Sequence, residues 1–309
     1  MSKKKRENFF HQYFIEWIHM YKVGAIRDTT LDKYYITHKH LVNLAPTLRL
    51  SDLNRKTYQK LLNDYALTHE RQTTMDFHHQ IKGAIHDAYD DGLLDRDPTR
   101  RAIIKGKDPG PKKALFLSQF ELKALLNELD LGPEINFDWL ILLLAKTGLR
   151  FGEALGVTPR DFDFSTQTLD VNKTWNYKKA EGGFQLTKNE SSNRKIQLDW
   201  QTATQFSNLI MNLRPDRPIF VGEKRIHNST INQLLQKHCE AANVPEITLH
   251  SLRHTHASLL LYSGVSLSTV AKRLGHSNTI TTQQTYLHIV QELENQDNNK
   301  MMAALSNIV

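Results

Sequence analysis

The sequence predicts a mainly α protein with a small β-sheet: a helical domain followed by a mixed α/β domain. Apolar residues recur every three to four positions through most of the chain, which is typical of amphipathic helices. Strand-like runs occur only between residues 168 and 198. A segment rich in Pro and Gly near residue 100 interrupts the helical pattern and indicates a domain boundary. At 309 residues the chain is long enough for each domain to bury its own core.

Residues 1–96 are expected to form a compact helical bundle. An apolar stripe that begins at Phe10 marks the first helix, and a capping-box pattern at 29–32 opens the second. The third helix is expected over about 54–68 and the fourth over about 74–89.

Residues 97–113 lack apolar periodicity and are expected to form an interdomain linker. One interpretation is a solvated hinge. The other is a basic strap across a nucleic-acid backbone, because each Lys or Arg that contacts phosphate releases counterions. The candidate backbone contacts are Arg100, Arg101, Lys105, Lys107, Lys112 and Lys113.

Residues 114–290 are expected to form the mixed domain. A second capping-box pattern at 118–121 opens its first helix, and the apolar run at 138–146 is expected to be a core helix. Further elements are expected at 168–174, 184–187 and 195–198 (strands) and at 199–213, 229–242, 249–262, 266–274 and 279–287 (helices). Residues 291–309 would be a tail, polar and then apolar, that either frays or docks on another subunit.

The composition favours a polyanionic partner. Lys and Arg total 40 against 33 Asp and Glu, which gives a net charge of +7. Cys239 is the only cysteine, which excludes an intrachain disulfide and favours a reducing compartment. Charged and polar residues interrupt the first apolar segment, and the run at 140–144 is too short to span a bilayer. We expect a soluble cytoplasmic protein without membrane contact.

The last third of the chain carries an ordered set of residues suited to phosphodiester chemistry. His250 and Arg253 lie one helical turn apart, and His276 and Tyr286 follow them. Upstream, Arg150 begins a helix, where backbone amides also favour anions. When a hydroxyl attacks a phosphodiester, negative charge accumulates on the non-bridging oxygens. Arginine suits this charge because its planar group donates paired hydrogen bonds and stays protonated.

Each of these residues has a structural alternative. Arg150 pairs with Glu153 on its own helix in one interpretation, and Arg253 is then a surface charge. Tyr286 would be a packing residue. The ordered combination indicates function, whereas no single residue does so alone.

The histidines of the 249–262 helix favour no metal site. His250 and His254 are one turn apart, but no carboxylate or cysteine accompanies them in that helix. His254 and His256 are expected to pack or to form local hydrogen bonds.

With these motifs the chain resembles tyrosine recombinases of the phage and conjugative-element integrase type. Residues 147–155 resemble the first arginine box of that family, 249–258 its His-x-x-Arg box and 274–277 its second histidine box. Tyr286 falls where the family places its nucleophile, and Lys188 resembles the hairpin lysine. Lys178, Lys179 and Lys195 lie near Lys188, and Ser251 stands where many relatives have an acidic residue.

The resemblance implies a site-specific DNA recombinase that needs no metal or other cofactor. Tyr286 would attack the scissile phosphate and form a covalent 3′-phosphotyrosine. Arg150 and Arg253 would bind the non-bridging oxygens, and His276 would donate a further hydrogen bond. Catalytic Lys188 would protonate the leaving 5′-hydroxyl, and His250 would assist proton transfer.

The resemblance also implies partners and an assembly. A core-type DNA-binding domain (1–96) and the catalytic domain would close as a C-shaped clamp around double-stranded DNA at specific attachment sites. A homotetramer linked through residues 291–309 would act on that DNA, with accessory DNA-bending or excisionase proteins. The arm-binding domain of many relatives is expected to be missing or removed, because the core-binding helix already starts at Phe10.

Other functions stay open at this stage. A DNA-binding protein without catalysis also fits a basic chain, because the 266–274 helix and its turn fit half of a helix-turn-helix. A topoisomerase would use the same chemistry. A metal-dependent nuclease is disfavoured because no close acidic cluster stands out. Integration, excision and inversion of a mobile element are all compatible with the sequence.

Overall fold

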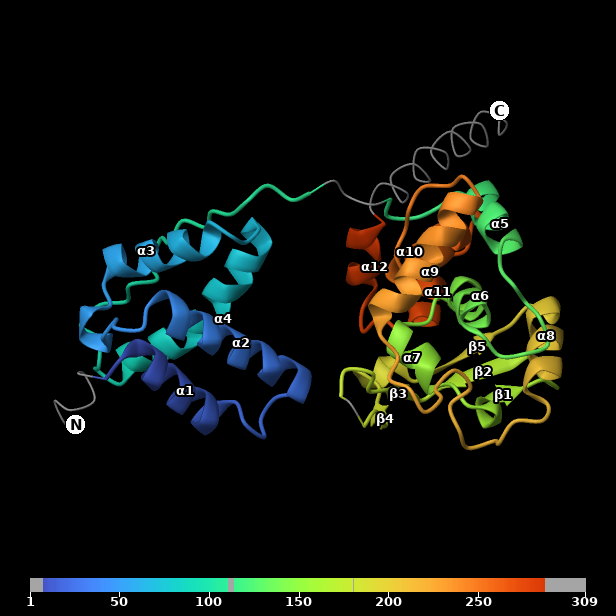
Figure 1. The fold of residues 1–309 in the computed structure, drawn as a ribbon, viewed down its shortest axis with the longest axis horizontal. Helices are drawn as coiled ribbons and strands as arrows, with labels where there is room; N and C mark the ends of the chain where they lie inside the picture. Colours follow the sequence, from blue (N-terminus) through green and yellow to red (C-terminus); the bar gives the residue numbers. More distant parts are fainter. Residues whose placement is uncertain (1–7, 111–113, 180, 287–309) are drawn as a thin grey trace, which may run out of the picture. The chain divides into compact units, whose positions relative to one another are not determined.

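The computed structural model describes residues 8–110, 114–179 and 181–286. The chain divides into two compact units, Met1–Pro111 and Lys112–Val309 (Figure 1). Both units are mainly helical, and the strands lie in the second, so the predicted fold class is confirmed. Lys112, Lys113 and the tail 291–309 lie outside the described residues.

The first unit is a helical bundle around an aromatic-rich core. Its described elements are α1 (Phe10–Tyr21), α2 (Asp28–Leu44), the 3₁₀ turn η2 (Leu50–Asp52), α3 (Arg55–Ala66) and α4 (Arg71–Asp90). Phe14, Tyr58 and Phe77 are fully or almost fully buried among the aliphatic residues. The predicted capping box at 29–32 is wrong, because α2 begins earlier, with Arg27 at its N-cap and no capping side chain.

The start of the predicted linker is fixed on the first unit. The Asp97 carboxylate accepts hydrogen bonds from the backbone and hydroxyl of Thr99, at 2.8 and 2.7 Å. The Gln59 amide donates to the carbonyl of Ile103 at 2.8 Å and accepts from its N–H at 2.9 Å. The Gln59 side chain of α3 thus forms two hydrogen bonds with the backbone of Ile103, as a neighbouring β-strand would.

The same segment ends in a close backbone contact. The N–H of Lys107 donates to the carbonyl of His69 at 2.9 Å. A Cβ on Gly106 would lie 2.1 Å from the backbone nitrogen of Arg71, so only glycine fits. Residues 97–107 are therefore a strap that belongs to the first unit.

The second unit combines eight described helices with two small antiparallel sheets. Its described helices are α5 (Gln119–Asn127), α6 (Phe137–Thr147), α7 (Phe151–Gly156), α8 (Trp200–Ile210), α9 (Asn228–Ala241), α10 (Leu249–Tyr262), α11 (Leu267–Leu274) and α12 (Thr279–Thr285), with the 3₁₀ turns η3 (Pro159–Asp161) and η4 (Glu190–Ser192). Its strands are β1 (Phe162–Asp163), β2 (Thr168–Val171), β3 (Lys173–Trp175), β4 (Phe184–Leu186) and β5 (Arg194–Gln197). The predicted capping box at Ser118 and Glu121 is confirmed.

The single strand predicted at 168–174 is two separate strands in the structure. The run 168–174 divides at Asn172: β2 joins β1 and β5 in a three-stranded sheet, while β3 pairs with β4 in a separate hairpin. Periodicity could not show this division because both pieces have strand-like composition.

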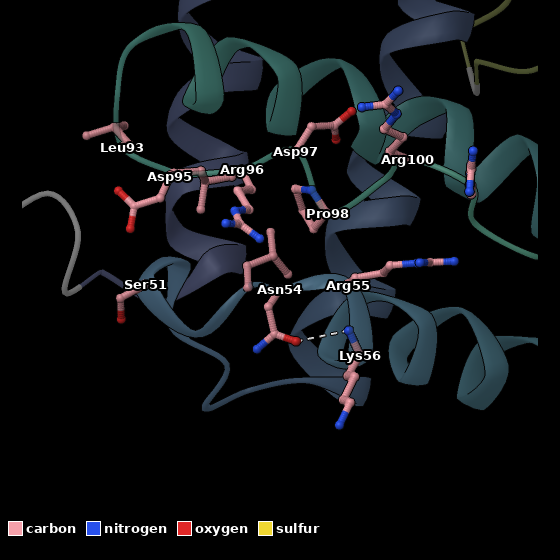
Figure 2. A pocket seen from close by; sticks show the side chains of 13 residues that line it. Ser51, Asn54, Arg55, Lys56, Leu93, Asp95, Arg96, Asp97, Pro98 and Arg100 are labelled. Atoms are coloured by element: carbon pink, nitrogen blue, oxygen red, sulfur yellow. Dashed lines mark hydrogen bonds between the residues drawn. The ribbon is translucent and has the colours of Figure 1, made fainter.

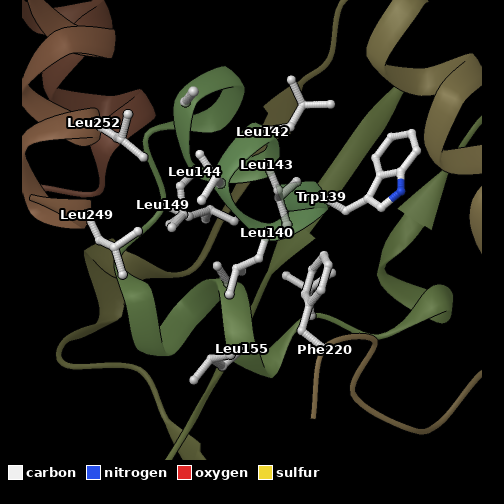
Figure 3. Packing of buried hydrophobic residues seen from close by; sticks show 14 of the residues in the cluster. Trp139, Leu140, Leu142, Leu143, Leu144, Leu149, Leu155, Phe220, Leu249 and Leu252 are labelled. Carbon is white, nitrogen blue, oxygen red and sulfur yellow. The ribbon is translucent and has the colours of Figure 1, made fainter. Parts of the chain in front are cut away.

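Helix α6 is the centre of the second core. Residues Trp139–Ala145 are all buried, as predicted for the 138–146 helix. Figure 3 shows its leucines beside Leu249 and Leu252 of α10 and Leu155 of α7. Gly148 ends α6 in the left-handed conformation (φ 67°), and Arg150 then caps α7. The core thereby fixes the position of Arg150.

Across the described segments, no helix combines the length and apolar character needed to cross a membrane.

Candidate active site

The two predicted arginines converge on one turn of the chain. The Arg253 guanidinium donates to the carbonyls of Gly148 at 2.7 Å and Leu274 at 2.6 Å. Arg150 donates to the next carbonyl, that of Gly275, at 3.2 Å. Two cations from segments about a hundred residues apart therefore meet immediately before His276.

A buried carboxylate holds Arg150. Glu153 accepts a hydrogen bond from the Arg150 side chain at 2.7 Å and one from its backbone at 3.0 Å. Arg194 donates to the same carboxylate at 3.1 Å. Burial alone would raise the pKa of Glu153, but Arg194 and Arg150 outweigh it and hold that pKa below its usual range. Arg150 therefore pairs with Glu153, as in the structural alternative, and at the same time meets Arg253 at the end of α11.

Arg253 is buried yet charged. Burial and the positive charge of Arg150 lower the pKa of Arg253 to about 9, so the side chain remains a cation at neutral pH. The Arg150 side chain keeps 29 % exposure, which leaves room for an anion to reach it.

The two predicted histidines border these arginines. His276 Nδ1 lies 2.6 Å from the hydroxyl of Thr282. Burial, with the charges of Arg253 and Arg150, lowers the pKa of His276 to about 4. Burial and the same two charges also lower the pKa of His250. An unliganded site therefore contains neutral imidazoles, and a bound phosphate anion would raise their pKa values.

Tyr286 is packed inside the second unit. Its side chain is only 1 % exposed and lies in an apolar cluster with Leu261 and Leu274. Its hydroxyl lies 3.0 Å from Nδ1 of His254, one turn along α10 from His250. Burial raises the pKa of Tyr286 to about 12 against the opposing charge of Arg253. The phenol is thus protonated and enclosed by protein.

Lys188 lies on the segment between β4 and η4. Its residue is exposed, and it follows buried Thr187, whose hydroxyl donates to Asn193 at 2.8 Å. Ser192 of η4 accepts a hydrogen bond from Arg150 at 3.4 Å, so this segment borders the arginine pair.

The sequence interpretation missed two contacts of this site. His254 was expected to bond locally, but its partner is Tyr286, which lies far along the chain. Arg194 was not among the candidate site residues. Its burial at a strand start, with the alternation of β5 turning it inward, is the signal that was available.

Among the residues that the structure describes, no group of three or more His, Cys, Asp or Glu side chains is arranged to hold a metal ion. Positive charge at the site comes from arginine.

A separate basic cavity lies in the first unit. It has a volume of about 890 Å³ and lies between the start of α3 and the strap (Figure 2). Two residues predicted to contact the DNA backbone, Arg100 and Arg101, line this cavity. Arg55, Lys56 and Arg96 line it as well. The sequence did not connect Arg55 and Lys56 with the linker, because these two residues lie some forty residues upstream of it. Arg101 is held in the left-handed region (φ 59°), a strained conformation for this residue.

The sequence profile of the phage integrase family matches residues 115–292. The chain belongs to this family. It is 24 % identical to the integrase of Staphylococcus phage L54a over 94 % of this chain and 92 % of that protein. It is also 24 % identical to the ICEBs1 integrase of Bacillus subtilis, over 83 % of this chain and 74 % of the relative. The predicted resemblance is confirmed: the protein is a tyrosine recombinase of the phage or conjugative-element type, and thus a site-specific recombinase.

Solved structures share the fold. The Tn1549 transposon integrase in complex with a circular intermediate DNA superposes with a TM-score of 0.74 at 18 % identity, over 89 % of this chain and 94 % of that one. A lambda integrase dimer bound to a COC′ core site gives 0.66 at 16 % identity, over 91 % and 78 %.

Proposed function

We propose that this recombinase cleaves double-stranded DNA through Tyr286, which attacks the scissile phosphate and forms a covalent 3′-phosphotyrosine. The bond energy is kept in the adduct, so a 5′-hydroxyl of another strand can religate the DNA. The observation that carries the proposal is the meeting of Arg150 and Arg253 beside His276.

The arginines act on the phosphate. Both guanidiniums exchange carbonyl partners for non-bridging oxygens, which accept stronger, charge-assisted hydrogen bonds. His276 donates a further hydrogen bond to the same phosphate. Lys188 protonates the leaving 5′-oxygen, and His250 assists transfer of the Tyr286 proton.

The chemistry proceeds without metal or other cofactor. In a phosphoryl transfer the main demand is stabilisation of charge on the oxygens, and two arginines held in place meet it without reorganisation. Chelators should therefore leave cleavage unchanged.

The first unit contributes DNA-backbone contacts. The cavity near Arg100 and Arg101 concentrates positive charge, and Arg55, Lys56 and Arg96 extend it. Lys105 and Lys107 continue along the strap, and we propose that Lys112 and Lys113 also contact the DNA backbone. The Tn1549 and lambda integrases are bound to DNA in their structures, which supports attachment-site DNA as the partner here.

The active assembly is proposed to be a homotetramer on DNA in the cytoplasm, with residues 291–309 linking protomers and accessory DNA-bending or excisionase proteins guiding direction. A chain ending at Glu292 should cleave DNA yet assemble poorly. Unchanged recombination by that chain would contradict this role of the tail.

The experiment uses nicked suicide duplexes drawn from DNA that flanks the gene for this chain. Incubation with EDTA should yield a covalent protein–DNA adduct, and Tyr286→Phe should yield none while still binding the duplex. Specific binding without any adduct would favour the alternative of a DNA-binding protein without catalysis.

A further inference from the structure

Three arginines cap three successive carbonyls at the end of α11. Arg194 Nε donates to the carbonyl of Arg273 at 2.6 Å. Arg253 and Arg150 donate to the next two carbonyls, at 2.6 and 3.2 Å. The last carbonyls of a helix have no partner within it and form its negative end, so each is a favourable acceptor for a guanidinium. Only two of these arginines have a place in the proposed chemistry.

The third arginine is enclosed by protein. The Arg194 side chain is 5 % exposed, against 29 % for Arg150. Besides the carbonyl of Arg273, it donates to the carbonyl of Ser192 at 2.8 Å and to the carboxylate of Glu153 at 3.1 Å. Its donors therefore point to three separate segments of this unit and not to the solvent-facing side, where a phosphate would bind.

We propose that Arg194 is a positioning residue for strand cleavage, which fixes Arg150 through Glu153 and fixes His276 through the end of α11. The inference rests on the proposed function. A guanidinium has a planar fork of donors, so one side chain pins three segments at a fixed geometry. Lysine offers a single flexible point charge and cannot hold all three.

Gly275 fits this arrangement. It adopts the left-handed conformation (φ 70°), and a Cβ there would lie 3.0 Å from Nη1 of Arg194 and 3.1 Å from the carbonyl of Ser191. The absence of a side chain lets the loop that carries Ser191 and Ser192 approach α11. Arg194 fills the junction between them.

The first test is a single-turnover measurement of adduct formation on the suicide duplex. For Arg194→Lys we expect a rate lower by about ten- to a hundredfold, as for other residues that orient a reacting group through a second one. DNA affinity should stay within about twofold, since Arg194 does not reach the substrate. The matched control is Arg214→Lys, because Arg214 is an exposed arginine with a 71 % accessible side chain, and its rate should not change.

The second test is the pH–rate profile, which a merely structural role would not move. Arg194 is the strongest of the charges that lower the pKa of Glu153. In Arg194→Gln, which removes this charge, Glu153 takes up a proton at higher pH and releases Arg150, so the acid limb of the profile should move to higher pH. In a Glu153→Gln background, Arg194→Gln should produce no such movement.

The proposal is overturned by a wild-type rate for Arg194→Lys or by a wild-type pH–rate profile for Arg194→Gln. It is equally overturned if the rate falls only in proportion to DNA affinity and folded fraction, measured by circular dichroism. Failure of the proposed function looks different, because the unsubstituted chain would then form no adduct at all.

Discussion

The two units of this protein differ in what they bury. Among the described residues of the first unit, no Asp, Glu, Lys or Arg is buried, and its core is aromatic and aliphatic. The described part of the second unit buries five such residues: Asp138, Glu153, Asp161, Arg194 and Arg253. Three of the five surround the end of α11.

The difference separates stability from function. A buried ion pair loses hydration, so it stabilises a fold no better than apolar residues of the same volume would. The described part of the first unit packs mainly apolar side chains and buries polar ones, such as Thr74, without burying Asp, Glu, Lys or Arg. The second unit keeps charges at the place where we propose that a phosphate binds. Hydrogen bonds to backbone carbonyls and ion pairs between these side chains hold them in position.

The largest expected effect is on the charges of the second unit. Arg150→Gln should lower the rate of adduct formation by about 10²- to 10³-fold, because one donor to the developing phosphate charge is lost. The melting temperature should change little, since this side chain is partly exposed. Single-turnover kinetics with Arg214→Gln as control measures the effect. Equal rates for the two variants would remove Arg150 from the reaction.

The next largest effect concerns the strap of the first unit. Gly106→Ala should cost about 3 kcal/mol of unfolding free energy, since the added Cβ overlaps the backbone of Arg71. Gly110→Ala is the matched control, because nothing lies within 4 Å of its Cβ position. Urea unfolding compares the two. If Gly106→Ala is as stable as Gly110→Ala, the strap is not part of the first unit.

A smaller effect is the acid sensitivity of the second unit. Burial lowers the pKa of His254 and His276 to about 4 and that of His256 to about 3. Between pH 6.5 and 4 the unfolded chain binds protons that these folded histidines do not, so stability should fall as pH falls through this window.

His256→Gln tests this acid sensitivity. Removing one such histidine should reduce the loss of unfolding free energy between pH 6.5 and 4.5 by about 2 kcal/mol. Chemical denaturation at each pH gives the slope. A variant with the same slope as the unsubstituted chain would show that His256 takes up its proton equally in both states.

The smallest effect is expected at a surface pair of the first unit. Lys60 and Asp64 form an ion pair one turn apart on α3, with the lysine side chain 76 % exposed. Lys60→Ala should change the unfolding free energy by no more than about 0.5 kcal/mol, because such pairs are solvated and screened by salt. Urea unfolding at low and high salt measures it. A loss of unfolding free energy above about 1 kcal/mol would contradict the difference between this exposed pair and the buried charges.

Sequence reasoning reached the features that depend on local pattern. The helical stripes, the apolar α6 helix and the capping box at Ser118 follow from periodicity and from residues three apart, and all are present. The order of Arg150, Arg253, His276 and Tyr286 indicated the family, which the comparison with the phage integrase profile confirmed.

Sequence reasoning missed the features that depend on contacts between residues far apart in the chain. Gln59 pairs with Ile103, and Arg194 joins Glu153 to the end of α11, across separations of 41 to 79 residues. The alternation of β5 turns Arg194 inward, but no local pattern shows which distant groups it meets there. Likewise, the hydroxyl of Tyr286 meets His254 only because α10 and the chain after α11 pack together.

The most direct test of the central claim is to identify the atom that carries the DNA. The adduct trapped on a nicked duplex in EDTA is digested with trypsin and nuclease, and the modified peptide is sequenced by mass spectrometry. We expect a 3′-phosphate joined to the side chain of Tyr286 and to no other residue. A linkage to a different side chain, or to a 5′-phosphate, would contradict the proposed mechanism.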